Sequence, residues 1–153
     1  MFMHNGQVGG WKKMRRHVES MISDMHYPAR AGTSDSEALF LAALSAGLEE
    51  DPVGAMRTVL GRVKRLMRNA SIEEPLRFTA ALTDGETLFA FRWSCDDRPP
   101  TLYYREREGG LLLVSEPIDD ERGGWRALPC GATLVAECGI VTSVTAQAQL
   151  EMA

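Results

Sequence analysis

Hydrophobic residues recur every three or four positions in the first half of the chain, a spacing typical of amphipathic helices. The first such segment runs from Trp11 to Met25, the second from about Ser34 to about Glu49, and the third begins at Asp51-Pro52. The apolar positions of these three segments are Met14, Val18, Met21, Ile22 and Met25, then Leu39, Phe40, Leu44 and Leu48, then Met56, Val59, Leu60, Val63, Leu66 and Met67. We interpret the methionines as core residues. The pattern predicts three helices, each burying one face.

Two of these helix starts carry capping residues. The segment Ser34-Asp35-Ser36-Glu37 has the spacing of a capping box, in which Ser34 accepts from the amide of Glu37 and Glu37 accepts from the amide of Ser34. Asp51 precedes Pro52, which predicts an aspartate N-cap followed by proline in the first turn.

From Pro75 onwards the periodicity changes to that of β-strands, with turn residues between the apolar runs. The predicted strands are Leu76 to Leu82, Thr87 to Trp93, Thr101 to Arg105, Leu111 to Ser115, Thr133 to Glu137 and Ile140 to Ala146. Their turns are marked by Asp84-Gly85, Arg98-Pro99-Pro100, Gly109-Gly110 and Gly139. Phe2 and Met3 look like the end of a further, buried strand. One strand, three helices and a mostly antiparallel meander predict an α+β fold in one domain over residues 1–153.

Composition narrows the classes of function. The formal net charge is −4 and the pI about 5.4, so we expect no nucleic-acid partner. A basic cluster consists of Lys12, Lys13, Arg15 and Arg16, and it is either a solvated helix face or an anion site. Three cysteines without CxxC spacing favour a reducing compartment, and we expect a cytoplasmic protein. No apolar run of membrane-spanning length and no signal peptide occur, so no membrane partner is expected.

Three short segments have residues suited to chemistry. In His4-Asn5-Gly6, an asparagine side-chain amide and a glycine N–H could form an oxyanion-binding pair, although Asn-Gly is also a common turn. Asp35 could hold a substrate ammonium, or it could face solvent and only stabilise the start of the helix through its negative charge. Ser115 would need a neighbouring base to act as a nucleophile, and no GxSxG motif surrounds it. No metal-ligand spacing or phosphate loop is present, so we expect no metal or cofactor.

The order of four motifs resembles that of class II glutamine amidotransferases. Phe2 to Trp11 resembles their "MHNG" segment, and Thr33 to Leu39 resembles their "TDSE" helix start. Leu76 to Phe91 resembles their "TDGETL" hairpin, and Leu113 to Asp120 resembles the "VSEPLDD" strand of the stand-alone, single-domain branch. The resemblance covers nearly the whole chain, in order.

This resemblance implies a fold, a reaction and three site residues. The fold is the αββα sandwich of the N-terminal nucleophile hydrolases, with two stacked antiparallel sheets between helix layers. Asn5 and the Gly6 amide match the oxyanion-hole pair, and Asp35 matches the aspartate that binds the α-amino group of glutamine. In that family an N-terminal cysteine, with its own α-amine as base, attacks the γ-carboxamide of glutamine and releases ammonia.

The sequence departs from the family at the nucleophile. Residue 2 is phenylalanine and not cysteine. No part of this sequence matches the family segment that precedes "MHNG". That segment would carry the cysteine, the first strands and an arginine for the substrate carboxylate. We therefore expect a partial fold with an exposed sheet edge, truncated by a start-site error or a gene lesion, and inactive as this chain alone. Two alternatives stay open: a γ-glutamyl amide hydrolase of a small-molecule pathway, and a non-catalytic remnant that binds glutamine or a partner. The ammonia acceptor and any protein partner are not indicated.

Overall fold

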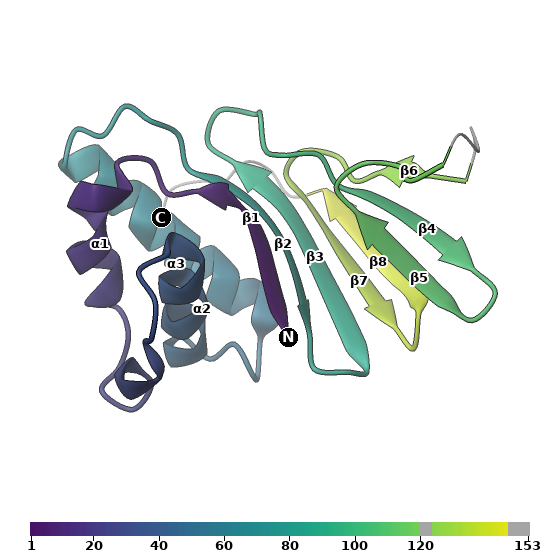
Figure 1. Cartoon of the computed structure of the whole chain (residues 1–153), viewed down its shortest axis with the longest axis horizontal. Coiled ribbons are helices and arrows are strands. Elements are labelled where there is room, and N and C mark those ends of the chain that lie inside the picture. The colour runs from purple at the N-terminus through teal and green to yellow at the C-terminus, as the bar shows by residue number, and fades with distance from the viewer. Residues whose placement is uncertain (120–123, 147–153) are drawn as a thin grey trace. The chain divides into compact units, whose positions relative to one another are not determined.

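Residues 1–119 and 124–146 are described by the structure, a computed structural model in which the chain forms two compact units (Figure 1). Among the described residues, the strand unit contains Met1–Gly6 with residues 77–119 and 124–146, and the helix unit contains Gln7–Leu76. The order of elements is one strand, three α-helices and then strands, as the sequence predicts. A short 3-10 helix between the first two α-helices was not predicted. The single domain over residues 1–153 and the packing of the helices on the sheets stay predictions.

The helix unit consists of α1 (Trp11–Glu19), the 3-10 helix η1 (Tyr27–Ala29), α2 (Asp35–Ser45) and α3 (Pro52–Asn69). The two predicted N-caps are confirmed: Ser34 Oγ accepts from the Glu37 N–H at 3.3 Å, and Asp51 Oδ1 accepts from the Gly54 N–H at 2.9 Å. The other half of the capping box is wrong, because the Glu37 carboxylate accepts from the N–H groups of Ala31 and Gly32 instead. None of the helices in the described residues is long and apolar enough to cross a membrane.

Two helices end earlier than the sequence predicts. Helix α1 ends at Glu19 and not at Met25, whose side chain is 83% exposed. Ser20 Oγ donates to the His17 carbonyl at 2.8 Å, and such local side-chain bonds compete with the helical ladder. Helix α2 ends at Ser45 and not near Glu49, because Gly47 adopts a φ of +89°, which stops the helix in the manner of a C-terminal glycine.

The strand unit contains two sheets. The larger has the order β1-β2-β3-β7-β8 and the smaller the order β5-β4-β6, and every pair with a described register is antiparallel. The strands are β1 (Phe2–Gln7), β2 (Arg77–Thr83), β3 (Thr87–Ser94), β4 (Tyr103–Arg107), β5 (Gly110–Val114), β6 (Arg126–Ala127), β7 (Ala132–Glu137) and β8 (Ile140–Ala146). The predicted strands are confirmed within one or two residues, whereas the two-residue β6 was not predicted.

One apolar cluster of the strand unit draws on both sheets. Its buried members include Ala90 and Leu134 of the larger sheet and Tyr104 of the smaller, and Leu111 and Val141 pack against it. Burial of such side chains favours folding by about 25 cal/mol for each Å² of apolar surface. The cluster therefore gives the two sheets a shared core.

The start of the chain differs from the sequence prediction in two ways. Asn5 and Gly6 lie inside strand β1 and not in a turn, and Met3, expected to be buried, is 61% exposed. Strand β1 lies beside β2, where a Cβ on residue 6 would come within 2.1 Å of the Arg77 carbonyl oxygen. Glycine at position 6 therefore serves close strand packing, and pairing with β2 outweighs the local turn preference of Asn-Gly.

Candidate functional site

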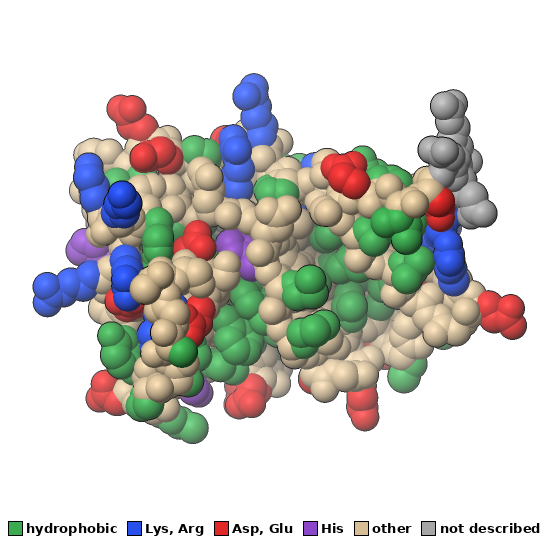
Figure 2. All heavy atoms as spheres, viewed as in Figure 1, with side chains coloured by type: hydrophobic (Ala, Val, Ile, Leu, Met, Phe, Trp, Pro, Cys, Tyr) green, Lys and Arg blue, Asp and Glu red, His purple; other side chains and the backbone are tan. Residues whose placement is uncertain are grey.

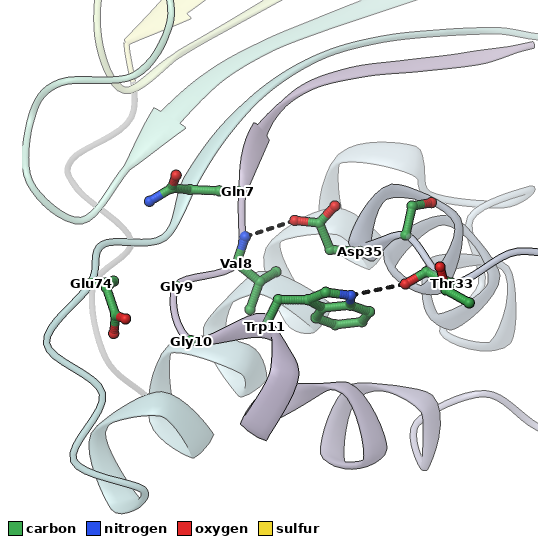
Figure 3. Close-up of a pocket in the computed structure, with 9 residues that line it drawn as sticks. Gln7, Val8, Gly9, Gly10, Trp11, Thr33, Asp35 and Glu74 are labelled. Carbon is green, nitrogen blue, oxygen red and sulfur yellow. Dashed lines mark hydrogen bonds between the residues drawn. The ribbon is translucent and has the colours of Figure 1, made fainter.

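A pocket of about 560 Å³ lies within the helix unit, where the chain leaves β1 and enters α1. It is lined by three segments that are far apart in the sequence: residues 7–11, residues 33–35 and Glu74 (Figure 3). Its walls combine backbone groups, the Trp11 indole and two carboxylates, those of Asp35 and Glu74. Small-molecule sites are mostly apolar hollows with a few placed polar groups, and this open pocket has the polar groups and one aromatic side chain, that of Trp11.

Asp35 is the first residue of α2, directly after the Ser34 cap. Its Oδ2 accepts from the Val8 N–H at 2.9 Å (Figure 3). Its Oδ1 accepts from the Ser36 N–H at 2.8 Å. Because each carboxylate oxygen has two lone pairs, both oxygens can still accept a bond from a ligand. The half-buried side chain lines the pocket, so the interpretation of Asp35 as a purely solvent-facing residue is wrong.

Trp11 and Arg30 hold the segment that leads into Asp35. The indole Nε1–H of Trp11 donates to the Thr33 carbonyl at 2.9 Å, as Figure 3 shows. The Arg30 guanidinium, 5% exposed, donates to the Ser34 carbonyl at 3.0 Å and pairs with both Glu19 and Glu37. These contacts fix residues 33 and 34 to the helices on either side.

The two glutamates that flank Arg30 are both stabilised in their charged form. Hydrogen bonds from the Ala31 and Gly32 N–H groups, with the charge of Arg30, lower the pKa of Glu37. Burial alone would raise the pKa of Glu19, but hydrogen bonds and charge from Arg15 and Arg30 outweigh it and lower that pKa. Near neutral pH the loop before Asp35 is therefore held by ion pairs.

Two glycines shape the pocket on its other side. A Cβ on Gly9 would come within 2.1 Å of the Glu74 carbonyl oxygen, so the two backbones touch there. Gly10 has a φ of +62° and precedes the first turn of α1, a conformation that favours glycine. The Gly9-Gly10 turn thus lets the chain reverse closely against residues 72–74.

The sequence-predicted residues fall in different units. Asp35 lines the pocket, whereas Asn5 and Gly6 belong to the strand unit and are not among its lining residues. Their convergence on Asp35 stays a prediction. Sequence reasoning missed the roles of Val8, Trp11 and Glu74, because no local pattern marks them and only the fold brings them beside Asp35.

Among the described residues, the remaining candidates show no catalytic arrangement. Ser115 is exposed just after β5, and Glu116 accepts a bond from Thr101 Oγ1. The three cysteines are free thiols, and burial raises the pKa of Cys130, which disfavours its thiolate. Within residues 1–119 and 124–146, no group of His, Cys, Asp and Glu has the arrangement of a metal site. Asp120, the end of the "VSEPLDD"-like motif, lies outside the described residues.

Comparison with known proteins indicates the class of protein. No family model matches the chain. The chain is 41% identical in sequence to a glutamine aminotransferase class-II domain protein from Silicibacter pomeroyi, with a TM-score of 0.88 over 96% of this chain and 66% of that one. A predicted glutamine amidotransferase from Pseudomonas aeruginosa shares the fold, with 20% identity, a TM-score of 0.55, and coverage of 93% of this chain and 59% of that one.

A curated relative agrees with this class. The chain is 29% identical to the probable glutamine amidotransferase DUG3 of Saccharomyces cerevisiae over 173 residues, which take in 87% of this chain and 48% of that protein. The chain thus spans about half the length of the curated relative it matches. Its homologues and structural neighbours are glutamine amidotransferase-like proteins, and the fold is mixed α and β with antiparallel sheets, as theirs is.

Proposed function

We propose that the chain takes part in hydrolysis of the γ-carboxamide of glutamine, as the glutamine-binding part of a class II amidotransferase of the N-terminal nucleophile hydrolase type. Asp35 binds the α-ammonium group of the substrate. Asn5 Nδ2 and the Gly6 N–H bind the oxyanion that forms on the γ-carbonyl. No cofactor is required for this reaction.

The hydrogen bond between the Val8 N–H and Asp35 Oδ2 carries the proposal. It fixes a carboxylate in a pocket beside backbone that follows Asn5-Gly6 directly in sequence. Because three residues of extended chain span at most about 10 Å, chain connectivity limits how far Asn5 can lie from Val8. An ammonium bound by a fixed carboxylate gains a charge-assisted hydrogen bond, which is stronger than a neutral one.

The proposal assigns substrate binding, and not cleavage, to residues 1–153 acting alone. The nucleophile of this chemistry is a cysteine with a free α-amine. Cys95, Cys130 and Cys138 lie within the sequence, so their α-nitrogens are in peptide bonds. We expect no ammonia release from glutamine by the purified chain. Ammonia release that disappears when one of these cysteines is changed to serine would contradict this assignment.

Calorimetric titration of the purified chain with L-glutamine tests the binding site. Binding is expected for L-glutamine and expected to be lost for glutaramate, which lacks only the α-amino group. Asp35→Asn should weaken glutamine binding about tenfold or more, since it removes the charge. Asn at this position keeps an acceptor for the Val8 N–H. The control variant Asp24→Asn, at an exposed carboxylate of the same unit, should bind as the parent does.

Three results would count against the proposal or refine it. Equal binding of glutaramate and glutamine, or full binding by Asp35→Asn, would overturn the role of Asp35. Tighter binding of a γ-glutamyl alkylamide than of glutamine would favour a γ-glutamyl amide hydrolase. If the chain binds glutamine and yet releases no ammonia when it is joined to a segment that supplies the cysteine, that result would favour a non-catalytic glutamine-binding protein.

A further inference from the structure

Trp11, the first residue of α1, forms an aromatic wall of the pocket. Its indole Nε1–H donates to the Thr33 carbonyl at 2.9 Å, and this bond fixes the orientation of the half-buried ring. Because the hydrogen bond uses only the N–H edge of the indole, the π-face of the ring stays available to a ligand in the pocket.

Two cross-links place this ring beside the Asp35 carboxylate. The Val8 N–H donates to Asp35 Oδ2 at 2.9 Å, and three residues further along the chain the Trp11 indole donates to Thr33. Thr33 and Asp35 flank Ser34, the N-cap of α2. Figure 3 shows the indole lying next to the Asp35 side chain. A carboxylate and an aromatic ring thus form neighbouring parts of one wall.

The described residues that line the pocket carry negative charge and no positive charge. Asp35 and Glu74 are its acidic lining residues, and none of its lining residues is Lys or Arg. Lys and Arg side chains gather over the region of α1 (Figure 2), but they do not line the pocket. A cation is therefore attracted to the pocket, whereas a carboxylate of a ligand is repelled.

The rings of the other two tryptophans already have contacts of their own. Trp125 lies under the Arg105 guanidinium, whose central carbon is 4.3 Å from the ring centroid, so this chain already contains one cation–π pair. Trp93 is 3% exposed and packs edge-on against Phe91. Trp11 differs from both because its ring meets a pocket that contains carboxylates.

We propose that Trp11 is a specificity-determining residue, whose ring face binds the ammonium group of the substrate together with the Asp35 carboxylate. This inference rests on the proposed function and extends it, since it adds a second group that recognises the α-ammonium of glutamine. Asp35 supplies charge and hydrogen-bond acceptors. Trp11 supplies the negative face of its ring, which attracts a cation within about 6 Å of the centroid. The pair selects organic ammonium ions over neutral and anionic ligands of the same shape.

Calorimetric titration of the purified chain with L-glutamine and with 4-aminobutanamide tests this pair. The second probe is glutamine without its α-carboxylate, and it keeps the ammonium and the carboxamide. Trp11→Phe and Trp11→Leu both remove the indole N–H and with it the bond to Thr33, but only phenylalanine keeps an aromatic face. Trp11→Leu should therefore bind both probes about threefold or more weakly than Trp11→Phe does.

Fluorinated tryptophans at position 11 separate the electrostatics of the ring from its shape. They keep the N–H and nearly the same size, while each added fluorine withdraws negative charge from the ring face. Affinity for both probes should fall stepwise with the number of fluorines, and the melting temperature should stay near that of the parent chain. The same series at position 125, which is not among the lining residues, should leave the affinity unchanged.

The outcomes distinguish this inference from the proposed function. Equal affinities of Trp11→Phe and Trp11→Leu, or a constant affinity along the fluorinated series, would overturn the role of Trp11. The proposed function would survive that result if Asp35→Asn still weakened glutamine binding. Full binding by Asp35→Asn would overturn the proposed function and, with it, the pairing of Asp35 with Trp11. A parent chain that binds neither probe would overturn both.

Discussion

The Val8 amide donates to Asp35 Oδ2 over 2.9 Å and so joins the residue that follows β1 to the first residue of α2. Val8 is 2% exposed, so its N–H has little access to water as an alternative partner. One carboxylate therefore serves as a structural acceptor and as a wall of the pocket. Any test of Asp35 must separate these two roles.

Replacing Asp35 should reveal the structural role through stability. Asp35→Ala leaves the buried Val8 N–H without this acceptor, which should lower the free energy of unfolding by about 1–3 kcal/mol. Asp35→Asn keeps an oxygen acceptor and should cost less. Urea unfolding at neutral pH measures both values, and an alanine variant as stable as the asparagine variant would show that the bond to Val8 contributes nothing.

The ion pair of Arg77 with Asp96 should make stability fall in acid. Hydrogen bonds from Arg77, Ser94 and the Arg98 N–H, with the charge of Arg77, lower the pKa of Asp96 to about 2. A lowered folded-state pKa contributes stability above the unfolded pKa of about 3.9, and this contribution is lost as pH falls towards 2. Asp96→Asn should therefore reduce the difference in melting temperature between pH 5 and pH 2.

The exposed carboxylate Glu108 provides the matched control for this acid effect. Glu108→Gln should leave the same pH difference nearly as it is in the parent chain. An Asp96→Asn variant with the full parental acid sensitivity would mean that other groups control it.

The turn between β7 and β8 offers a stabilising substitution. Cys138 and Gly139 have φ values of +49° and +79°, the left-handed pair of a two-residue type I′ hairpin, and cysteine is poorly suited to that conformation. Cys138→Asn should raise the free energy of unfolding by up to about 1 kcal/mol. Thermal unfolding measures this change, and Cys95→Asn, at another exposed cysteine, should give no gain.

Gly139 should not tolerate a side chain, because of its backbone conformation and because of a close neighbour. Its φ is left-handed, and a Cβ there would lie 2.8 Å from Gly110 Cα. Gly139→Ala should lower the free energy of unfolding by about 1 kcal/mol or more. An alanine variant of parental stability would show that the turn can shift without cost.

Kinetics should separate the proposed roles of Asn5 and Asp35 in a polypeptide that joins this chain to a segment supplying the cysteine nucleophile. Asn5→Ala should mainly lower kcat, by about 10²–10³-fold, because its donor acts on the transition state. Asp35→Ala should mainly raise KM for glutamine, because the ammonium contact exists before and during reaction. An unchanged kcat in Asn5→Ala would eliminate the oxyanion role.

Features decided by neighbouring residues were readable from the sequence. The caps at Ser34 and Asp51 depend on a side-chain oxygen and an amide three residues away, and both form as predicted. The Asp84-Gly85 turn is likewise local, because Asp84 Oδ1 accepts from the Glu86 and Thr87 N–H groups. Strand alternation after Pro75 located the meander for the same reason, and Asp35 stood out by its place in the first turn of α2.

Only tertiary structure decided the rest. Asn5-Gly6 has the local preference of a turn, but pairing of β1 with β2 and the close approach of Gly6 to Arg77 keep it extended. The pocket needs Trp11, Thr33 and Glu74 beside one another, and contacts across more than twenty residues of chain bring them there. The sequence by itself therefore determined where the helices and most of the strands begin, since those signals are local hydrogen bonds and periodicity. It did not determine the pocket wall, because that wall depends on which distant segments meet.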